Sequence, residues 1–138
     1  MKFILHPRLE ADTITIGDLA LSRVLLMNDS RFPWVILVPR RNEMREIIDL
    51  SQADQLQLFG EIQSVLNAIR IAFEPDKLNL GAIGNLVPQL HIHMIARFKS
   101  DAAWPNPVWG FGDAVPYSAA DLRSNMVAIS SRLTFLSL

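Results

Sequence analysis

The sequence predicts a fold that combines a β-sheet with α-helices, in which one long helix covers a face of the sheet. Several short apolar runs are separated by clusters of turn-forming residues, which is typical of strands. One longer stretch carries apolar residues at every third or fourth position, the repeat of a helix. A third stretch, Gln89 to Met94, alternates polar and apolar residues and predicts a half-buried strand.

The strands can be placed by their composition and by the turns between them. Residues 13–16 alternate and end at a Gly-Asp turn, so they form a strand. The apolar runs 19–27 and 34–39 flank a cluster of turn formers and predict a hairpin at the centre of the sheet. Residues 77–80 form a further strand, and residues 3–5 form a short edge strand or the wall of a pocket.

Two helices begin at recognisable caps. Ser51, with Asp54 three residues later, resembles a capping box that opens a long helix, which Pro75 prevents from continuing. Ser118 with Asp121 gives the same signal for a C-terminal helix over residues 119–133, and residues 43–50 form one or two helical turns. The long helix is expected to bury one stripe against the sheet: Leu56, Phe59, Ile62, Val65, Leu66, Ile69 and Phe73.

Size and composition exclude several classes of protein. A chain of 138 residues fits a single domain over residues 1–138 with a real hydrophobic core. The formal net charge of −1 provides no basic field for nucleic acid, so no nucleic-acid partner is expected. The absence of cysteine excludes disulfides, thiol nucleophiles and Cys-ligated zinc. The N-terminal apolar run is too short for a signal peptide and no segment is long enough to span a membrane, so a cytoplasmic location is expected.

The alternating stretch holds two of the three histidines. Strand geometry puts Gln89, His91 and His93 on one face. The intervening apolar residues Leu90, Ile92 and Met94 point to the opposite face, where they can pack in a core. A strand backed by core holds two imidazoles at a fixed separation, which suits catalysis.

The residues alone leave three interpretations of this pair. His91 and His93 could be two ligands of a zinc ion, with a third from an Asp or Glu elsewhere. They could instead contact a phosphate beside the Gly81 to Gly84 loop, with His91 as a nucleophile that forms a phosphohistidine. They could also be ordinary surface or core histidines. The remaining histidine, His6, precedes a proline and is interpreted as a solvent-facing or capping residue.

The stretch Gln89-Leu90-His91-Ile92-His93-Met94-Ile95 resembles the motif of the histidine triad family, in which three histidines alternate with apolar residues. The resemblance extends over residues 21–97, because the helix, the Asn79 strand, the glycine loop and the motif come in the family's order. Gln89 stands where the first histidine belongs. Leu86 is a second departure, since the family often has a hydroxyl residue there.

The resemblance implies an α+β fold with an antiparallel sheet of about five strands, and a homodimer in which two sheets run together. It also implies a nucleotide hydrolase or transferase that acts on the α-phosphate of a nucleoside phosphoramidate or dinucleoside polyphosphate and needs no cofactor. His91 would be the catalytic nucleophile. The phosphate would contact Gln89, His93, Asn79, Gly84 and Asn85, and the nucleoside would contact Leu26 and Asn28.

Gln89 can form hydrogen bonds but cannot titrate, so any proton transfer by the first histidine is lost. The change at Gln89 does not remove the nucleophile, so the expected function remains covalent nucleotide chemistry at His91. Two alternatives stay open: a nucleotide-binding protein or sensor without catalysis, and a zinc-dependent hydrolase. Trp104 and Trp109 are expected in packing or a dimer contact, and Arg97 could anchor a loop carboxylate or a phosphate.

Overall fold

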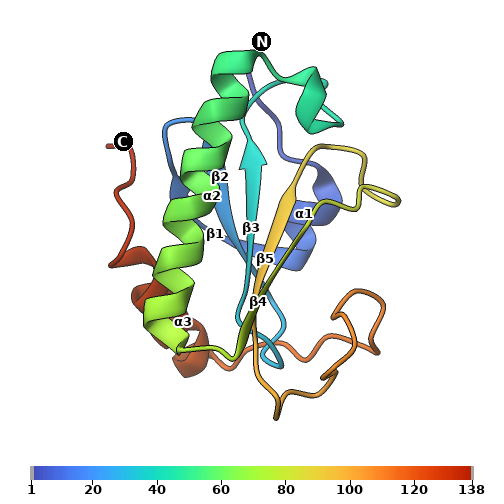
Figure 1. Ribbon diagram of the computed structural model, residues 1–138, viewed down its shortest axis with the longest axis vertical. Helices are drawn as coiled ribbons and strands as arrows, with labels where there is room; N and C mark the ends of the chain where they lie inside the picture. Colours follow the sequence, from blue (N-terminus) through green and yellow to red (C-terminus); the bar gives the residue numbers. More distant parts are fainter. Residues whose placement is uncertain (1, 138) are drawn as a thin grey trace.

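The computed structural model describes residues 2–137, and in this part of the chain five antiparallel strands form one sheet in the order β1-β2-β3-β5-β4 (Figure 1). This confirms the predicted α+β fold. The strands are β1 (Thr13–Asp18), β2 (Ser22–Met27), β3 (Trp34–Pro39), β4 (Lys77–Gly81) and β5 (Ile92–Arg97). The helices are α1 (Pro7–Asp12), α2 (Gln52–Phe73) and α3 (Ala119–Ser130), with a 3₁₀ turn at Ile47–Asp49.

The strand and cap predictions are confirmed with shifted boundaries. The β2–β3 hairpin lies at the centre of the sheet, and Ser51 and Ser118 cap α2 and α3 by accepting from the amides of Asp54 and Asp121. The regular pairing of β5 begins at Ile92, later than the alternating stretch predicts. Of the two alternatives for residues 3–5, the edge strand is wrong, because this segment forms no strand and leads into α1.

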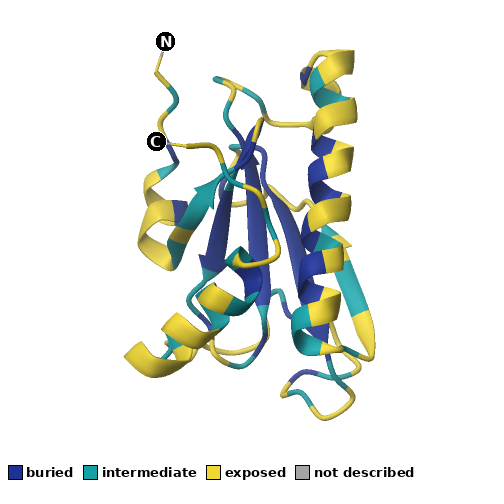
Figure 2. Cartoon of the chain, turned by 90° about the vertical axis from the view of Figure 1, so that its left-hand side faces the viewer, coloured by how far each residue is buried: buried dark blue, intermediate teal, exposed yellow. Residues whose placement is uncertain are grey.

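The sheet has a core on each face. On one face, α2 and α3 cover a cluster that includes Leu26, Leu90, Ile92 and Met94. Figure 2 shows that the buried residues of α2 lie along the side turned to the sheet. The opposite face carries a second cluster, to which α1 contributes Leu9 and the segment after β5 contributes Ala103 and Val108.

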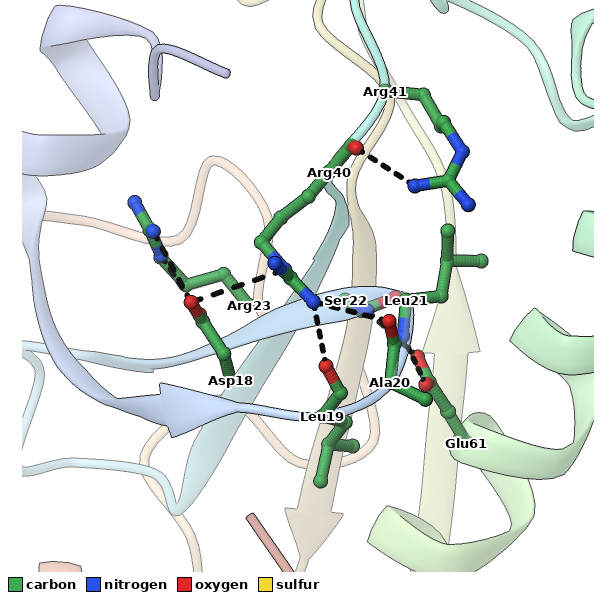
Figure 3. A network of polar contacts seen from close by, with 9 residues as sticks. All are labelled: Asp18, Leu19, Ala20, Leu21, Ser22, Arg23, Arg40, Arg41 and Glu61. Atoms are coloured by element: carbon green, nitrogen blue, oxygen red, sulfur yellow. Dashed lines mark hydrogen bonds and ion pairs between the residues drawn. The ribbon is translucent and has the colours of Figure 1, made fainter. Parts of the chain in front are cut away.

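The predicted stripe of α2 is partly wrong. Leu56 and Phe59 are 71% and 75% exposed, while Leu58 and Glu61 are buried. Glu61 has a physical reason to point inward: its carboxylate accepts from the backbone amides of Leu21 and Ser22, at 2.8 and 2.9 Å (Figure 3). A buried carboxylate is tolerated when it receives such hydrogen bonds. Apolar periodicity cannot show this, since it counts a glutamate as surface.

A buried ion pair anchors the long segment after β5. Arg97 and Asp101 are almost fully buried, and the Nε of Arg97 lies 2.7 Å from Oδ2 of Asp101. The same guanidinium donates to Oδ1 of Asn79 at 2.9 Å and to the carbonyl of Asn106 at 2.8 Å. Burial raises the pKa of Asp101, but hydrogen bonds from Arg97 and from backbone amides outweigh this effect. The pKa is therefore lowered to about 2. The pair thereby fixes the path of residues 98–110 beside β4 and β5.

No helix within residues 2–137 has the length and apolar character needed to cross a bilayer.

Candidate functional site

A cavity of about 470 Å³ opens on the face of the sheet that α2 does not cover. Its lining brings together the two motif histidines, the loop before β5, helix α1 and two tryptophans. These residues are Arg8, Leu9, Asp12, Met27, Trp34, Ile83, Gly84, Asn85, Leu86, Val87, His91, His93, Trp109 and Gly110. The site is therefore built from segments that lie far apart in the sequence.

His91 is held by the backbone that precedes it. Its Nδ1 lies 2.7 Å from the carbonyl oxygen of Gln89. A carbonyl only accepts, so Nδ1 carries the proton and Nε2 keeps a free lone pair. Burial lowers the pKa of His91, although the Gln89 contact works in the opposite direction. At neutral pH the ring is an uncharged imidazole with Nε2 available as a nucleophile or base.

His93 is locked in the complementary tautomer. The indole Nε1 of Trp34 donates to Nδ1 of His93 at 2.9 Å, and both side chains are buried. Nδ1 is thus an acceptor and the proton lies on Nε2. Burial, with a smaller contribution from His91, lowers the pKa of His93 to about 3. The ring centroids of the two histidines are 4.8 Å apart, so a fixed hydrogen-bond donor stands beside a free lone pair.

The loop before β5 supplies Gly84 and Asn85 to the same cavity. Gly84 has φ +72°, a conformation that residues with a side chain rarely adopt, so a glycine is favoured at this bend. Asn85 follows directly and is exposed. The loop therefore places Gly84 and Asn85 in the wall of the cavity that holds the two histidines.

Asn28 lines a neighbouring cavity of about 440 Å³. This cavity shares Arg8, Asp12, Met27, Trp34 and Gly110 with the histidine cavity, so the two have walls in common. The Oδ1 of Asn28 accepts from the backbone amide of Tyr117 at 3.0 Å, which fixes the orientation of its amide. Asn28 therefore lies in the wall of the neighbouring cavity with a fixed side-chain orientation.

Three predicted site residues are not brought to the cavity. Leu26 is fully buried in the core under α2, because side chains alternate along β2, and the next residue, Met27, lines the cavity instead. Asn79 points to the Arg97 guanidinium. Gln89 uses its side chain on the N-terminal segment and does not line the histidine cavity.

The sequence interpretation missed Arg8, Trp34 and Trp109 as site residues. Trp109 lies against His93: the two ring centroids are 5.5 Å apart, and a Cβ at Gly81 would lie 2.9 Å from the indole. Trp34 was identifiable only as part of a strand. In the β3–β5 pairing, Trp34 lies opposite Ile95, and Ile36 lies opposite His93. The sequence does not specify this alignment of the two strands, so it does not show that Trp34 is near His93.

The zinc interpretation lacks a third ligand. Among residues 2–137, no group of three His, Cys, Asp or Glu side chains is arranged to hold a metal ion. His6, the remaining histidine, caps α1 by accepting from the amide of Arg8 at 3.1 Å, as the capping interpretation predicts. The donor set around His91 and His93 therefore fits an anion better than a metal.

The model of the family described as HIT domain matches residues 8–100. No curated protein matches the chain.

Three solved structures are similar to the whole chain. A histidine triad protein from Bradyrhizobium japonicum is 48% identical, with a TM-score of 0.94 over 96% of this chain and 98% of that one. Another from Sinorhizobium meliloti is 45% identical, with a TM-score of 0.93 over 95% and 97%. A third from Marinobacter aquaeolei is 44% identical, with a TM-score of 0.93 over 96% and 97%.

The state of His93 can be measured directly. We expect it to be neutral at pH 5 with its proton on Nε2, because burial disfavours the charged ring and Trp34 occupies Nδ1. In Trp34→Phe the titration of His93 should move to higher pH, since Nδ1 becomes free to accept a proton. Nitrogen-15 chemical shifts of labelled imidazoles report both effects.

Trp104→Phe is the matched control, because Trp104 stacks on Arg97 and does not line the cavity. It should leave the titration of His93 where it is in the wild type. A wild-type His93 that titrates near 6.5 would contradict this description of the site.

Proposed function

The chain belongs to the histidine triad family, and on that premise we propose that it is a nucleotide phosphohydrolase or nucleotidyl transferase with His91 as its nucleophile. The observation that carries the proposal is the contact between Nδ1 of His91 and the carbonyl of Gln89. It leaves the Nε2 lone pair free on a neutral ring that lines a cavity. The proposed substrate is a nucleoside phosphoramidate or a dinucleoside polyphosphate, cleaved at the α-phosphate.

The proposed reaction has two displacements. The Nε2 lone pair of His91 attacks the α-phosphorus, a P–N bond to His91 forms, and the bond from phosphorus to the leaving group breaks. A leaving amine departs with the bonding electron pair and takes up a proton from the solvent, whereas a leaving phosphate departs as the anion. Water then attacks the same phosphorus and gives up a proton to the solvent, the bond to His91 breaks, and the nucleoside monophosphate is released. A second nucleophile in place of water would make the reaction a transfer.

Charge on the phosphate is stabilised by donors that are already fixed. His93 offers Nε2–H, because Trp34 holds its Nδ1 as an acceptor. Gly84 and Asn85 border the same cavity and offer backbone or amide N–H groups. Donors that are already oriented stabilise developing charge without reorganising during the reaction. We assign the nucleoside to the neighbouring cavity, where Asn28 would contact the ribose.

A nucleotide-binding protein without turnover is the second candidate. The observation that favours it is the glutamine at position 89, which removes a titratable group from the motif. Binding requires the cavity and its donors, but it does not require attack by His91. The two candidates therefore differ in whether a covalent adduct forms.

The test is a rapid-quench experiment with an adenosine phosphoramidate. After quenching in alkali, which preserves a phosphohistidine, mass spectrometry of the intact protein should show a transient increase of one adenylyl group. Peptide mapping should place this group on His91, and AMP should be released. In His91→Ala the adduct and the turnover should both disappear, with a loss in rate of at least a thousandfold, as for removal of other catalytic nucleophiles.

An adduct on any other residue would contradict the assignment of His91. Micromolar binding of AMP without adduct or turnover would support the binding-protein candidate instead.

We also propose that the protein is a homodimer joined along the free edge of β4. The far edge of the sheet is partly covered, since the amide of Leu136 donates to the carbonyl of Asp18 on β1 at 2.8 Å. The β4 edge carries Leu80, which is 54% exposed. An open edge with an exposed apolar residue favours pairing with a second copy.

Light scattering at micromolar concentration should return the mass of a dimer. Leu80→Lys should shift the protein towards the monomer, because it places a charge in the proposed interface. Val127→Lys is the control, since Val127 is equally apolar and 64% exposed on α3, which contacts the β1 side of the sheet. A monomeric wild type would contradict the proposal.

A further inference from the structure

The side chain of Gln89 connects the motif to the N-terminus of the chain. Its Oε1 accepts from the backbone amide of His6 at 2.8 Å. Its Nε2 donates to the carbonyl of Ile4 at 2.9 Å. One amide group thus satisfies a backbone donor and a backbone acceptor two residues apart, in a segment more than eighty positions away. Both polar atoms of the side chain are engaged away from the histidine cavity.

The segment held by Gln89 leads directly into a wall of that cavity. His6 is the N-cap of α1, and Leu9 on the first turn is buried in the core beneath the helix. The cavity is lined on this side by Arg8, Leu9 and Asp12. A helix of six residues has little stability of its own, so its position depends on these attachments.

Arg8 is the one cation within residues 2–137 that lines the histidine cavity. His91 and His93 carry no charge at neutral pH, because burial lowers the pKa of each ring. Among the described residues, the cavity proposed for a phosphate therefore has no other positive charge. A guanidinium can bind a phosphate through two parallel hydrogen bonds.

The guanidinium of Arg8 is held only weakly by its ion-pair partner, Asp12. Its contact with Asp12 is an i,i+4 pair at 3.5 Å between side chains that are 62% and 50% exposed. Exposed pairs of this kind contribute little to stability, so the side chain can turn to a ligand at small cost. By contrast, Arg31 in the neighbouring cavity is engaged by both carboxylate oxygens of Asp29 and by the carbonyl of Phe111.

We propose that Gln89 is a positioning residue that fastens the N-terminal segment to the motif and so holds Arg8 at the cavity, where its guanidinium recognises the phosphate of the nucleotide. The proposal rests on the proposed function for the identity of the ligand. The first position of the triad then acts through α1 and has no contact with the phosphate. A glutamine suits this task because its amide offers one donor and one acceptor at every physiological pH.

Two variants separate the two steps of the proposal. In Gln89→Ala, backbone amides of residues 4–12 should exchange with deuterium at least tenfold faster, and the Kd for AMP should rise about tenfold, as expected when a charge-assisted hydrogen bond is lost. In Arg8→Ala, the Kd for AMP should rise by a similar factor while exchange in residues 4–12 changes much less. Arg8→Lys should recover part of the affinity because it keeps the charge.

Gln63→Ala is the matched control, since it removes an exposed glutamine side chain from α2. It should alter neither the exchange of residues 4–12 nor the affinity for AMP. In steady-state kinetics with a substrate that the enzyme cleaves, Gln89→Ala should raise KM more than it lowers kcat. The reason is that Gln89 does not touch the reacting phosphate. Far-ultraviolet circular dichroism establishes that each variant is folded.

Unchanged exchange in Gln89→Ala would overturn the fastening role. Wild-type affinity for AMP in Arg8→Ala would overturn the role of Arg8, and a loss confined to kcat in Gln89→Ala would indicate direct contact with the phosphate. Failure of the wild type to bind AMP would instead overturn the proposed function. The exchange measurement needs no ligand, so the two failures can be distinguished.

Discussion

The alternation of side chains along β5 and the residues just before it is the constraint on which the site depends. Leu90, Ile92 and Met94 pack into the core under α2, so the histidines between them must point to the other face. There both rings are buried, with His93 against Trp34 and Trp109, and burial keeps both neutral. The same packing that stabilises the sheet therefore leaves one ring with a free Nε2 lone pair and the other with an Nε2–H donor.

One wall of the site depends on a buried ion pair that lies outside the motif cavity. The buried Arg97–Asp101 pair fixes the segment after β5, and this segment brings Trp109 against Gly81 and His93. Breaking a buried pair by removing one partner leaves an unpaired charge and is strongly destabilising. Arg97 thus anchors a loop carboxylate, one of the two roles that the sequence allowed. Its contribution to the site is indirect, through the position of the loop.

Much of the fold could be predicted from the sequence, because strand alternation and helix caps are local signals. The hairpin, the caps at Ser51 and Ser118 and the shared face of His91 and His93 all follow from neighbouring residues. The placement of Gly84 and Asn85 follows from their closeness to the motif in the sequence. The resemblance to the family added the strand number and the catalytic assignment.

The remaining features depend on contacts between distant segments. Glu61 is buried because two backbone amides of the β1–β2 turn meet it, and no periodicity reveals that. Met27 takes the place expected for Leu26 because the register of β2 decides which side chain faces the cavity. Gln89 is attached to residues 4 and 6, which are more than eighty positions away in the sequence. No local sequence pattern indicates a contact between such distant segments.

Burial keeps the ring of His91 neutral, and the proposed nucleophilic role requires this neutral ring. The most direct measurement is the pH dependence of the rate of adduct formation with a dinucleoside polyphosphate, whose bridging phosphates do not titrate near neutrality. Protonation of Nε2 abolishes attack, and burial lowers the pKa of the ring. The rate should therefore stay constant as the pH falls from 8 through 6.5 and decline only at lower pH. A rate already halved at or above pH 6.5 would contradict the account.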